Sequence, residues 1–224
     1  MCTNYRPTSR DLVREMMALG ELPADLEWKS ETWKDYAAPI VRKSDAGREL
    51  LLATYGIVPR KRIPQGVKVF DTMNARFETI GEKRSFSGAW KRSQHCLVPM
   101  SAFYEPCYET GKPVRWGIGM ADQSQFAVAG LWREWEADGA LEYSFTQLTI
   151  NADDHPLMCR FHKPGDEKRS LVIVPRDEWH DWLACDDIEY ARTFMRPYPA
   201  EQMTSWEYPV PPRAKKTQSA PEPS

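Results

Sequence analysis

The chain has 224 residues, with 32 acidic and 30 basic side chains and a formal net charge of -2 at pH 7. This balance excludes a uniformly basic nucleic-acid binder, so any contact with phosphates would need a local basic patch. Hydrophobic residues make up 42% of the chain and aromatic residues 12%, which excludes a wholly disordered protein. This length predicts one compact domain over residues 1–212, followed by a disordered tail at residues 213–224.

The sequence has no stretch long and apolar enough to span a membrane, and its first residues lack the apolar run of a signal peptide. We therefore expect a cytoplasmic protein without membrane contact, associated with the nucleoid if the source is bacterial. We also expect a monomer. The cysteines are odd in number and form no CxxC pair, so we expect reduced thiols and neither a metal nor another cofactor. They are Cys2, Cys96, Cys107, Cys159 and Cys185.

The first predicted element is a helix at residues 9–19, where apolar side chains recur at helical spacing. Residues 28–39 are rich in tryptophan but have no convincing period, and we interpret them as a loop with short structure. After residue 49, short runs rich in Val, Ile and aromatic residues alternate with turn residues and predict about seven strands. These runs are residues 50–58, 67–72, 96–104, 114–120, 126–132, 143–150 and 171–174.

Turn signals at Thr110-Gly111, Ala121-Asp122 and Asp138-Gly139 divide four consecutive runs, which predicts an antiparallel meander. Two further helices are predicted at residues 177–184 and 187–195. The expected fold class is α+β: a mainly antiparallel, curled or barrel-like β-sheet with flanking helices.

Cys2 is the first candidate for chemistry. We expect Met1 to be removed, because the initiator methionine is commonly cleaved before a residue as small as cysteine. Cys2 would then carry a free amine, with a reference pKa of about 7.7 to 8.0, beside a thiol of about 8.5, so a usable fraction of each is nucleophilic near neutral pH. An aldehyde can form an imine with such an amine, and the thiolate can close on the imine carbon to give a thiazolidine ring.

Other polar residues could serve the same chemistry. Asn74 and Arg76 follow an apolar run and point to the same face of an extended segment, where an amide and a cation suit a sugar hydroxyl and an anionic backbone. Glu105 ends an aromatic-rich strand, where partial desolvation raises the pKa of a carboxyl and fits it for proton transfer. His155 and His162 lie in a polar loop, and histidine exchanges protons near neutral pH.

Together these features resemble the SOS response-associated peptidase (SRAP) family. The similarity spans roughly residues 1–212, and five modest motifs occur in the family's order. They are Met1-Cys2, the box Asn74-Ala75-Arg76-x-Glu78-Thr79, the strand from Cys96-Leu97-Val98-Pro99 to Phe103-Tyr104-Glu105, the strand Ala129-Gly130-Leu131-Trp132, and the histidine loop.

The resemblance implies an abasic-site DNA-protein crosslinking enzyme of DNA repair, with possible lyase activity and autoproteolytic removal of Met1. Its partner would be single-stranded DNA that contains abasic sites, held in a positively charged cleft. By position, Cys2 would be the crosslinking nucleophile, Asn74 would orient Cys2 and the opened sugar, Glu105 would transfer protons, and His162 would be the catalytic histidine. The arginines expected at the DNA are Arg6, Arg76, Arg84 and Arg169.

This chain departs from the family pattern at two places. Family members usually run from the histidine almost directly into Arg and Pro, whereas here residues 163–168 intervene and Ser170 replaces the proline. His155 is therefore kept as an alternative to His162. The family also commonly begins Cys-Gly-Arg, whereas Asn4 occupies the arginine position here, so Arg6 is the candidate replacement.

Three other classes of function remain open from the residues. Cys2, His162 and Asn74 could form the site of a cysteine peptidase. A non-covalent DNA-binding module would make Cys2 dispensable. A metal hydrolase could use His155, Cys159 and His162 as ligands.

Overall fold

The computed structural model describes residues 2–45 and 47–209, and in this part of the chain twelve strands form one continuous sheet. Five strands close into a barrel in the order β6, β8, β9, β4, β3 and back to β6, and only the β9–β4 pair is parallel. The predicted α+β fold with a closed, mainly antiparallel sheet is therefore confirmed. The boundary predicted at residue 212 and the tail at 213–224 lie outside the described residues. The barrel strands are β3 (Ala37–Ser44), β4 (Gly47–Tyr55), β6 (His95–Cys107), β8 (Phe126–Ala137) and β9 (Ala140–Asn151).

The long strand β6 organises the sheet. Its residues 95–100 pair with β8, and its residues 103–107 pair with β7. Because β6 is long enough to take two partners in succession, β7 does not lie between β6 and β8, and the predicted simple meander is wrong at this point. The second partner of β7 is β12 instead. The bounds are β7 (Val114–Met120) and β12 (Met203–Glu207).

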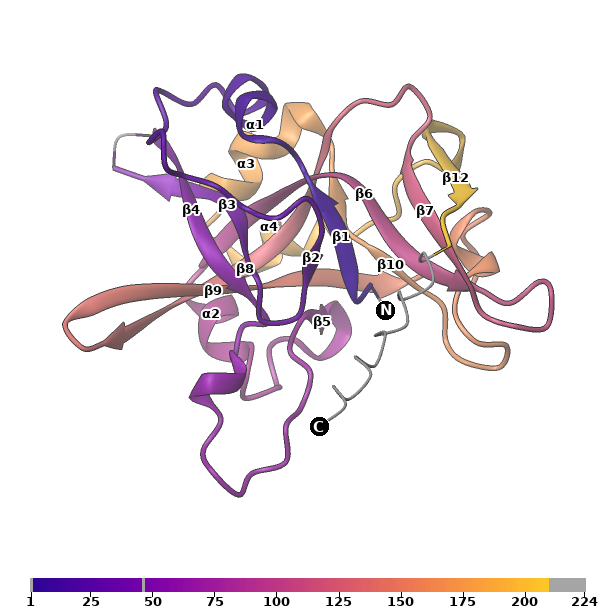
Figure 1. Ribbon diagram of the computed structural model, residues 1–224, viewed down its shortest axis with the longest axis horizontal. Coiled ribbons are helices and arrows are strands. Elements are labelled where there is room, and N and C mark those ends of the chain that lie inside the picture. Colours follow the sequence, from indigo (N-terminus) through magenta and orange to yellow (C-terminus); the bar gives the residue numbers. More distant parts are fainter. Residues whose placement is uncertain (1, 46, 210–224) are drawn as a thin grey trace, which may run out of the picture.

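Short strands bring distant parts of the chain to the barrel. β1 is antiparallel to β6, with Asn4 opposite Tyr104, and β5 is parallel to β9, with Asn74 opposite Gln147. Figure 1 shows β1 crossing the front of the barrel, while the hairpin of β8 and β9 extends to the left. The start of the chain therefore lies against the strand that ends near Glu105. The bounds are β1 (Asn4–Pro7), β2 (Thr32–Trp33), β5 (Asn74–Arg76), β10 (Arg169–Leu171) and β11 (Ile173–Val174).

Short helices cover the outside of the barrel, and the three predicted helices are confirmed with narrower bounds. α1 (Arg10–Met16) ends before residue 19, since Ala18 adopts a φ of 52° that a right-handed helix does not allow. Asp187 caps α4, because its carboxylate accepts the backbone N–H groups of Glu189 and Tyr190. No helix among the described residues is long and apolar enough to cross a membrane. The other helices are α2 (Ser87–Lys91), α3 (Trp179–Ala184) and α4 (Ile188–Arg192), with 3-10 turns at Arg60–Arg62, Phe77–Thr79, Met158–Arg160, Arg176–Glu178 and Ala200–Gln202.

Two local predictions are wrong. Residues 67–72 form no strand, and Val67, Val69 and Phe70 are 49%, 42% and 42% exposed, so an apolar alternation here belongs to a surface loop. Residues 37–39, interpreted as the end of a loop, instead begin β3, which pairs with β4 along its whole length. Pairing with a neighbouring strand, rather than any period of its own, stabilises β3.

The sheet is buried on both faces. One cluster fills the barrel and includes Tyr55, Phe103 and Phe145, while a second cluster, which includes Trp90 and Trp182, lies between the barrel and the helices. Inside the barrel the backbones approach closely at Gly130. A Cβ atom there would come within 2.8 Å of the carbonyl oxygen of Thr146 and 2.9 Å of the sulfur of Cys96, which explains a glycine within this strand.

His95 packs against the second cluster and should make the fold acid-sensitive. Its ring is stacked on Trp182 at 4.1 Å between centroids, and burial lowers the pKa of His95 to about 4. The unfolded chain would bind this proton below about pH 6.5, so stability present above that pH is lost as pH falls toward 4. We expect this loss to reach about 3 kcal/mol. Urea unfolding at pH 7.5 and at pH 4.5 measures it, and His95→Phe should show a smaller loss between these two conditions. An equal loss in the variant would show that another group is responsible.

Candidate active site

Cys2 lies two residues before the start of β1 and is only 1% exposed. Its carbonyl oxygen accepts a hydrogen bond from the Asn74 side-chain amide at 2.7 Å, and the hydroxyl of Tyr55 lies 3.1 Å from the same oxygen. The thiol of Cys2 donates to the carbonyl oxygen of Asn4 at 3.2 Å. Strands β4 and β5 thus fix the main chain of Cys2 at a defined place beside the barrel.

Sequence reasoning missed two residues that support this arrangement. The hydroxyl of Tyr55 lies 3.0 Å from the side-chain oxygen of Gln147, and both side chains are fully buried inside the barrel. Tyr55 was part of an apolar run and looked like a core residue. Gln147 carried a usable signal, because a glutamine within an apolar strand needs a buried hydrogen-bond partner.

Glu105 and His162 form a buried pair beside Cys2. Nε2 of His162 lies 3.2 Å from Oε2 of Glu105, and the side chains are 8% and 3% exposed. His162 has a φ of 68°, in the left-handed region that side chains rarely adopt, and its N–H donates to the carbonyl oxygen of Pro106 at 2.9 Å. This strained backbone conformation directs the histidine to the end of β6, where Glu105 lies.

The Cys2 thiol differs from the sequence-based expectation. Burial, and secondly the negative charge of Glu105, raise the pKa of the Cys2 thiol to about 12, well above the ordinary value of about 8.5. The expectation that a usable fraction of the Cys2 thiol is ionised at neutral pH is therefore wrong for the folded chain before it meets an aldehyde. The thiol keeps its proton until the charge beside it changes.

The second loop histidine, His155, has a structural arrangement. Its Nδ1 accepts the N–H groups of Leu157 and Met158, both at 3.1 Å, which leaves Nε2 to donate to the carbonyl oxygen of Tyr198 at 2.9 Å. One ring nitrogen thus stabilises the local turn, and the other joins this turn to Tyr198. The structure places His162, and not His155, beside Glu105.

The four arginines expected at DNA have different surroundings. Arg76 projects from β5 with 46% of its side chain exposed, and Arg84 is exposed in the turn that precedes α2. Arg6 is partly buried and donates to the hydroxyl of Tyr208 at 2.9 Å. Arg76 and Arg84 are therefore the more accessible cations of the set.

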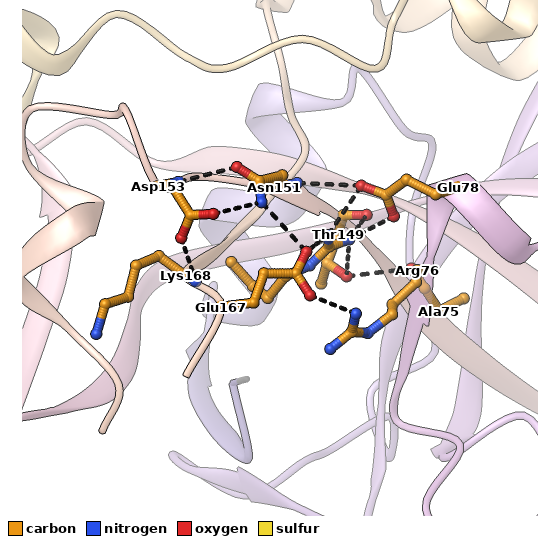
Figure 2. A network of polar contacts seen from close by, with 9 residues as sticks. Ala75, Arg76, Glu78, Thr149, Asn151, Asp153, Glu167 and Lys168 are labelled. Carbon is orange, nitrogen blue, oxygen red and sulfur yellow. Dashed lines mark hydrogen bonds and ion pairs between the residues drawn. The ribbon is translucent and has the colours of Figure 1, made fainter. Parts of the chain in front are cut away.

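Arg169 is 2% exposed and bonds to Glu78, Thr149 and Glu167, which Figure 2 labels within a polar network. Its two terminal nitrogens each donate to one oxygen of Glu78 at 2.8 Å, and one also donates to the carbonyl oxygen of Thr149 at 2.7 Å. A fork-shaped pair of this kind is among the stronger charged hydrogen bonds. Arg169 therefore joins β10 to β9 and to the turn after β5.

A further cation near the site, Arg115, was not identified from the sequence. Its guanidinium lies 3.6 Å from the centroid of the Tyr104 ring, which is stacked on Tyr208 at 5.2 Å. Arg115 also pairs with Glu31 at 3.0 Å. Tyr104 is 2% exposed and Trp90 is 2% exposed, so these aromatic residues are core residues rather than surfaces for base stacking.

Two of the alternative classes find little geometric support. The sulfur of Cys2 contacts the carbonyl of Asn4, whereas the ring of His162 contacts Glu105, so a cysteine–histidine pair of the peptidase type is not formed. Within residues 2–45 and 47–209, no group of three or more His, Cys, Asp or Glu side chains could hold a metal ion. His155, Cys159 and His162 therefore do not form a ligand set.

Comparison with known proteins agrees with this fold. The sequence model described as SOS response associated peptidase (SRAP) matches residues 1–216. A crystal structure of a protein from Bordetella bronchiseptica is 32% identical, covers 93% of this chain and 100% of its own, and superposes with a TM-score of 0.82. No curated protein matches the chain.

Two more distant crystal structures share the fold. A protein from Bacteroides thetaiotaomicron is 20% identical, with a TM-score of 0.69 and coverage of 92% of this chain and 91% of its own. A phage-related protein from Bordetella bronchiseptica is also 20% identical, with a TM-score of 0.65 and coverage of 94% and 95%. Because the family match spans nearly the whole chain, this protein belongs to the SOS response-associated peptidase family, which associates it with the response to DNA damage.

Proposed function

We propose that this protein captures abasic sites in single-stranded DNA covalently, through a thiazolidine formed by Cys2 after Met1 is removed. The linkage would shield the lesion during DNA repair. One observation carries the proposal: the main chain of Cys2 is held by Asn74 at 2.7 Å, and its thiol lies close enough to the buried Glu105–His162 pair for Glu105 to raise the thiol pKa. An amine, a thiol and a proton-transfer pair are thereby combined at one place.

The first step uses the amine. Its ordinary pKa of about 7.7 to 8.0 leaves an unprotonated fraction near neutral pH, while the thiol remains protonated. The amine nitrogen bonds to the aldehyde carbon of the opened sugar, and the resulting hydroxyl leaves as water. The Glu105 carboxylate, in contact with His162, is suited to take a proton from the amine nitrogen and pass it to the hydroxyl that leaves as water.

The second step uses the thiol. The cationic imine beside the sulfur favours the thiolate, because an adjacent positive charge lowers the pKa of a thiol. The thiol proton passes to the imine nitrogen and becomes the N–H of the new ring, while the sulfur bonds to the imine carbon and the π pair of the C=N bond returns to nitrogen. The aldehyde and the aminothiol give one thiazolidine and one water, with no oxidation or reduction.

The surface beside Cys2 suits a DNA strand. Arg76 lies two residues after Asn74 on β5 and is exposed, and Arg84 and Arg6 are further candidates for phosphate contact. Arg169 would support this surface from beneath through Glu78. Single-stranded DNA suits the reaction, because extruding a sugar from a duplex costs a few kcal/mol. The same proposal includes lyase activity from the imine, self-removal of Met1, and a cytoplasmic monomer.

The test is direct. The purified full-length protein is incubated with a single-stranded oligonucleotide that carries one abasic site, and the mixture is separated on a denaturing gel. We expect a denaturant-resistant species whose mass equals protein plus DNA minus one water, with the linkage mapped to Cys2. Reducing the abasic aldehyde with borohydride beforehand should abolish it. A linkage mapped to any other residue would refute the proposed nucleophile.

A further inference from the structure

Glu167 lies where the proposed DNA contact of Arg76 would form. The carboxylate pairs through one oxygen with Arg76, and its other oxygen accepts from Arg169 at 2.7 Å and from the Asn151 side chain at 3.2 Å. Figure 2 shows Glu167 between Arg76 and Asn151. The residue belongs to the segment of residues 163–168, which follows the active-site histidine directly.

The position of Glu167 is set by its neighbours. The backbone N–H of Lys168 donates to Asp153 at 2.8 Å, and the carbonyl oxygen of Lys168 accepts the N–H of Ala152 at 2.8 Å. The ammonium of Lys168 also donates to the carbonyl oxygen of His162 at 3.3 Å. The loop is therefore fixed to the end of β9 and to the histidine, so the carboxylate is held beside Arg76 rather than being free in solvent.

Glu167 is not required to balance the buried charge of Arg169. Glu78 already binds Arg169 through both oxygens at 2.8 Å. The remaining effect of Glu167 is on Arg76, an exposed cation that a DNA strand could reach. A guanidinium binds a carboxylate and a phosphate through the same planar set of N–H donors, so the two anions compete for it.

We propose that Glu167 is an internal competitor for a DNA phosphate at Arg76, which makes it a specificity-determining residue of this site. A strand gains the Arg76 contact only by displacing the carboxylate. Ligands without a phosphate at this point gain nothing from that displacement and are unaffected by Glu167. The inference rests on the proposed function, because it assigns Arg76 to a DNA phosphate.

The first measurement is the affinity for a single-stranded oligonucleotide that carries a tetrahydrofuran abasic analogue, which has no aldehyde. By fluorescence anisotropy at low salt, Glu167→Gln should bind about twofold to fivefold more tightly than wild type, the range of a partly exposed ion pair. The difference should shrink as salt screens both anions. Glu189→Gln, which removes an equal charge from the exposed pair with Arg192 on α4, should not reproduce it.

The second measurement tests whether Glu167 changes the affinity for DNA through Arg76. In an Arg76→Gln background, Glu167→Gln should give no further tightening, because the contested cation is gone. Reaction of Cys2 with glycolaldehyde, which has no phosphate, should proceed at the wild-type rate in Glu167→Gln. Unchanged or weaker DNA binding, tightening that persists without Arg76, or a slower glycolaldehyde reaction would each overturn the proposal. Failure of the proposed function would look different, because the wild-type protein would then form no adduct with glycolaldehyde or with the aldehyde of an abasic site.

Discussion

Cys2→Ala is expected to abolish the denaturant-stable crosslink to abasic DNA. Alanine is as suitable as cysteine for removal of Met1 by an aminopeptidase, and the variant with Met1 removed in this way keeps the terminal amine and can still form an imine. It lacks the sulfur that closes the ring, and an imine hydrolyses when the DNA is denatured and diluted. The measurement is a denaturing gel with and without borohydride. We expect no stable product without the reductant and a trapped imine with it.

A matched control separates this effect from the loss of any thiol. Cys159 is partly exposed and its sulfur contacts only a backbone carbonyl, at 3.6 Å in the described structure, so Cys159→Ala should crosslink like wild type. Stable crosslinking by Cys2→Ala at the wild-type rate would exclude a thiazolidine. Loss of crosslinking in Cys159→Ala would instead identify Cys159 as a cysteine that the reaction needs.

Glu105→Gln is expected to slow the crosslinking step by about a hundredfold to ten-thousandfold, the usual contribution of a general acid–base group. Glutamine keeps the shape of the side chain, but it cannot exchange a proton with the sugar or with the Cys2 thiol. The pH profile of the reaction should change as well, because the variant lacks the group that transfers the proton. Single-turnover rates across a range of pH values measure both effects.

The control for this variant lies nearby. Glu109 is an exposed carboxylate that pairs with Arg160 at 2.8 Å, two residues beyond the end of β6. Glu109→Gln should leave the rate unchanged, and Glu105→Gln should still bind the unreactive tetrahydrofuran oligonucleotide like wild type. A normal rate in Glu105→Gln would exclude the carboxylate from proton transfer and leave His162 to act without it.

The structure explains why some strands were predictable and others were not. β6, β8 and β9 are long and mostly buried, so their apolar runs are strong local signals. β5 has three residues and β2 has two, and both exist only because a neighbouring strand supplies hydrogen bonds. The exposed run at residues 67–72 has the opposite property, since it has a strand-like composition but no partner strand.

The residues of the candidate site likewise fall into those with a local sequence signal and those brought together only by the fold. Cys2, Asn74, Glu105 and His162 were identified from local motifs, and the structure brings all four to one end of the barrel. Tyr55 and Gln147 were not identified, because their hydroxyl–amide contact joins residues 92 positions apart. Barrel closure, which places β4 beside β9, is what brings these two side chains together.

The amino-acid sequence alone determined which groups could react: a cysteine that becomes terminal, a carboxyl at the end of an apolar strand, and a histidine in a polar loop. Those are properties of residue type and local pattern. The tertiary structure decided their protonation and access, because the pKa of the Cys2 thiol depends on burial and on the charge of Glu105. It also decided that Glu167 pairs with Arg76, a contact across 91 positions that depends on where β5 and β10 meet β9.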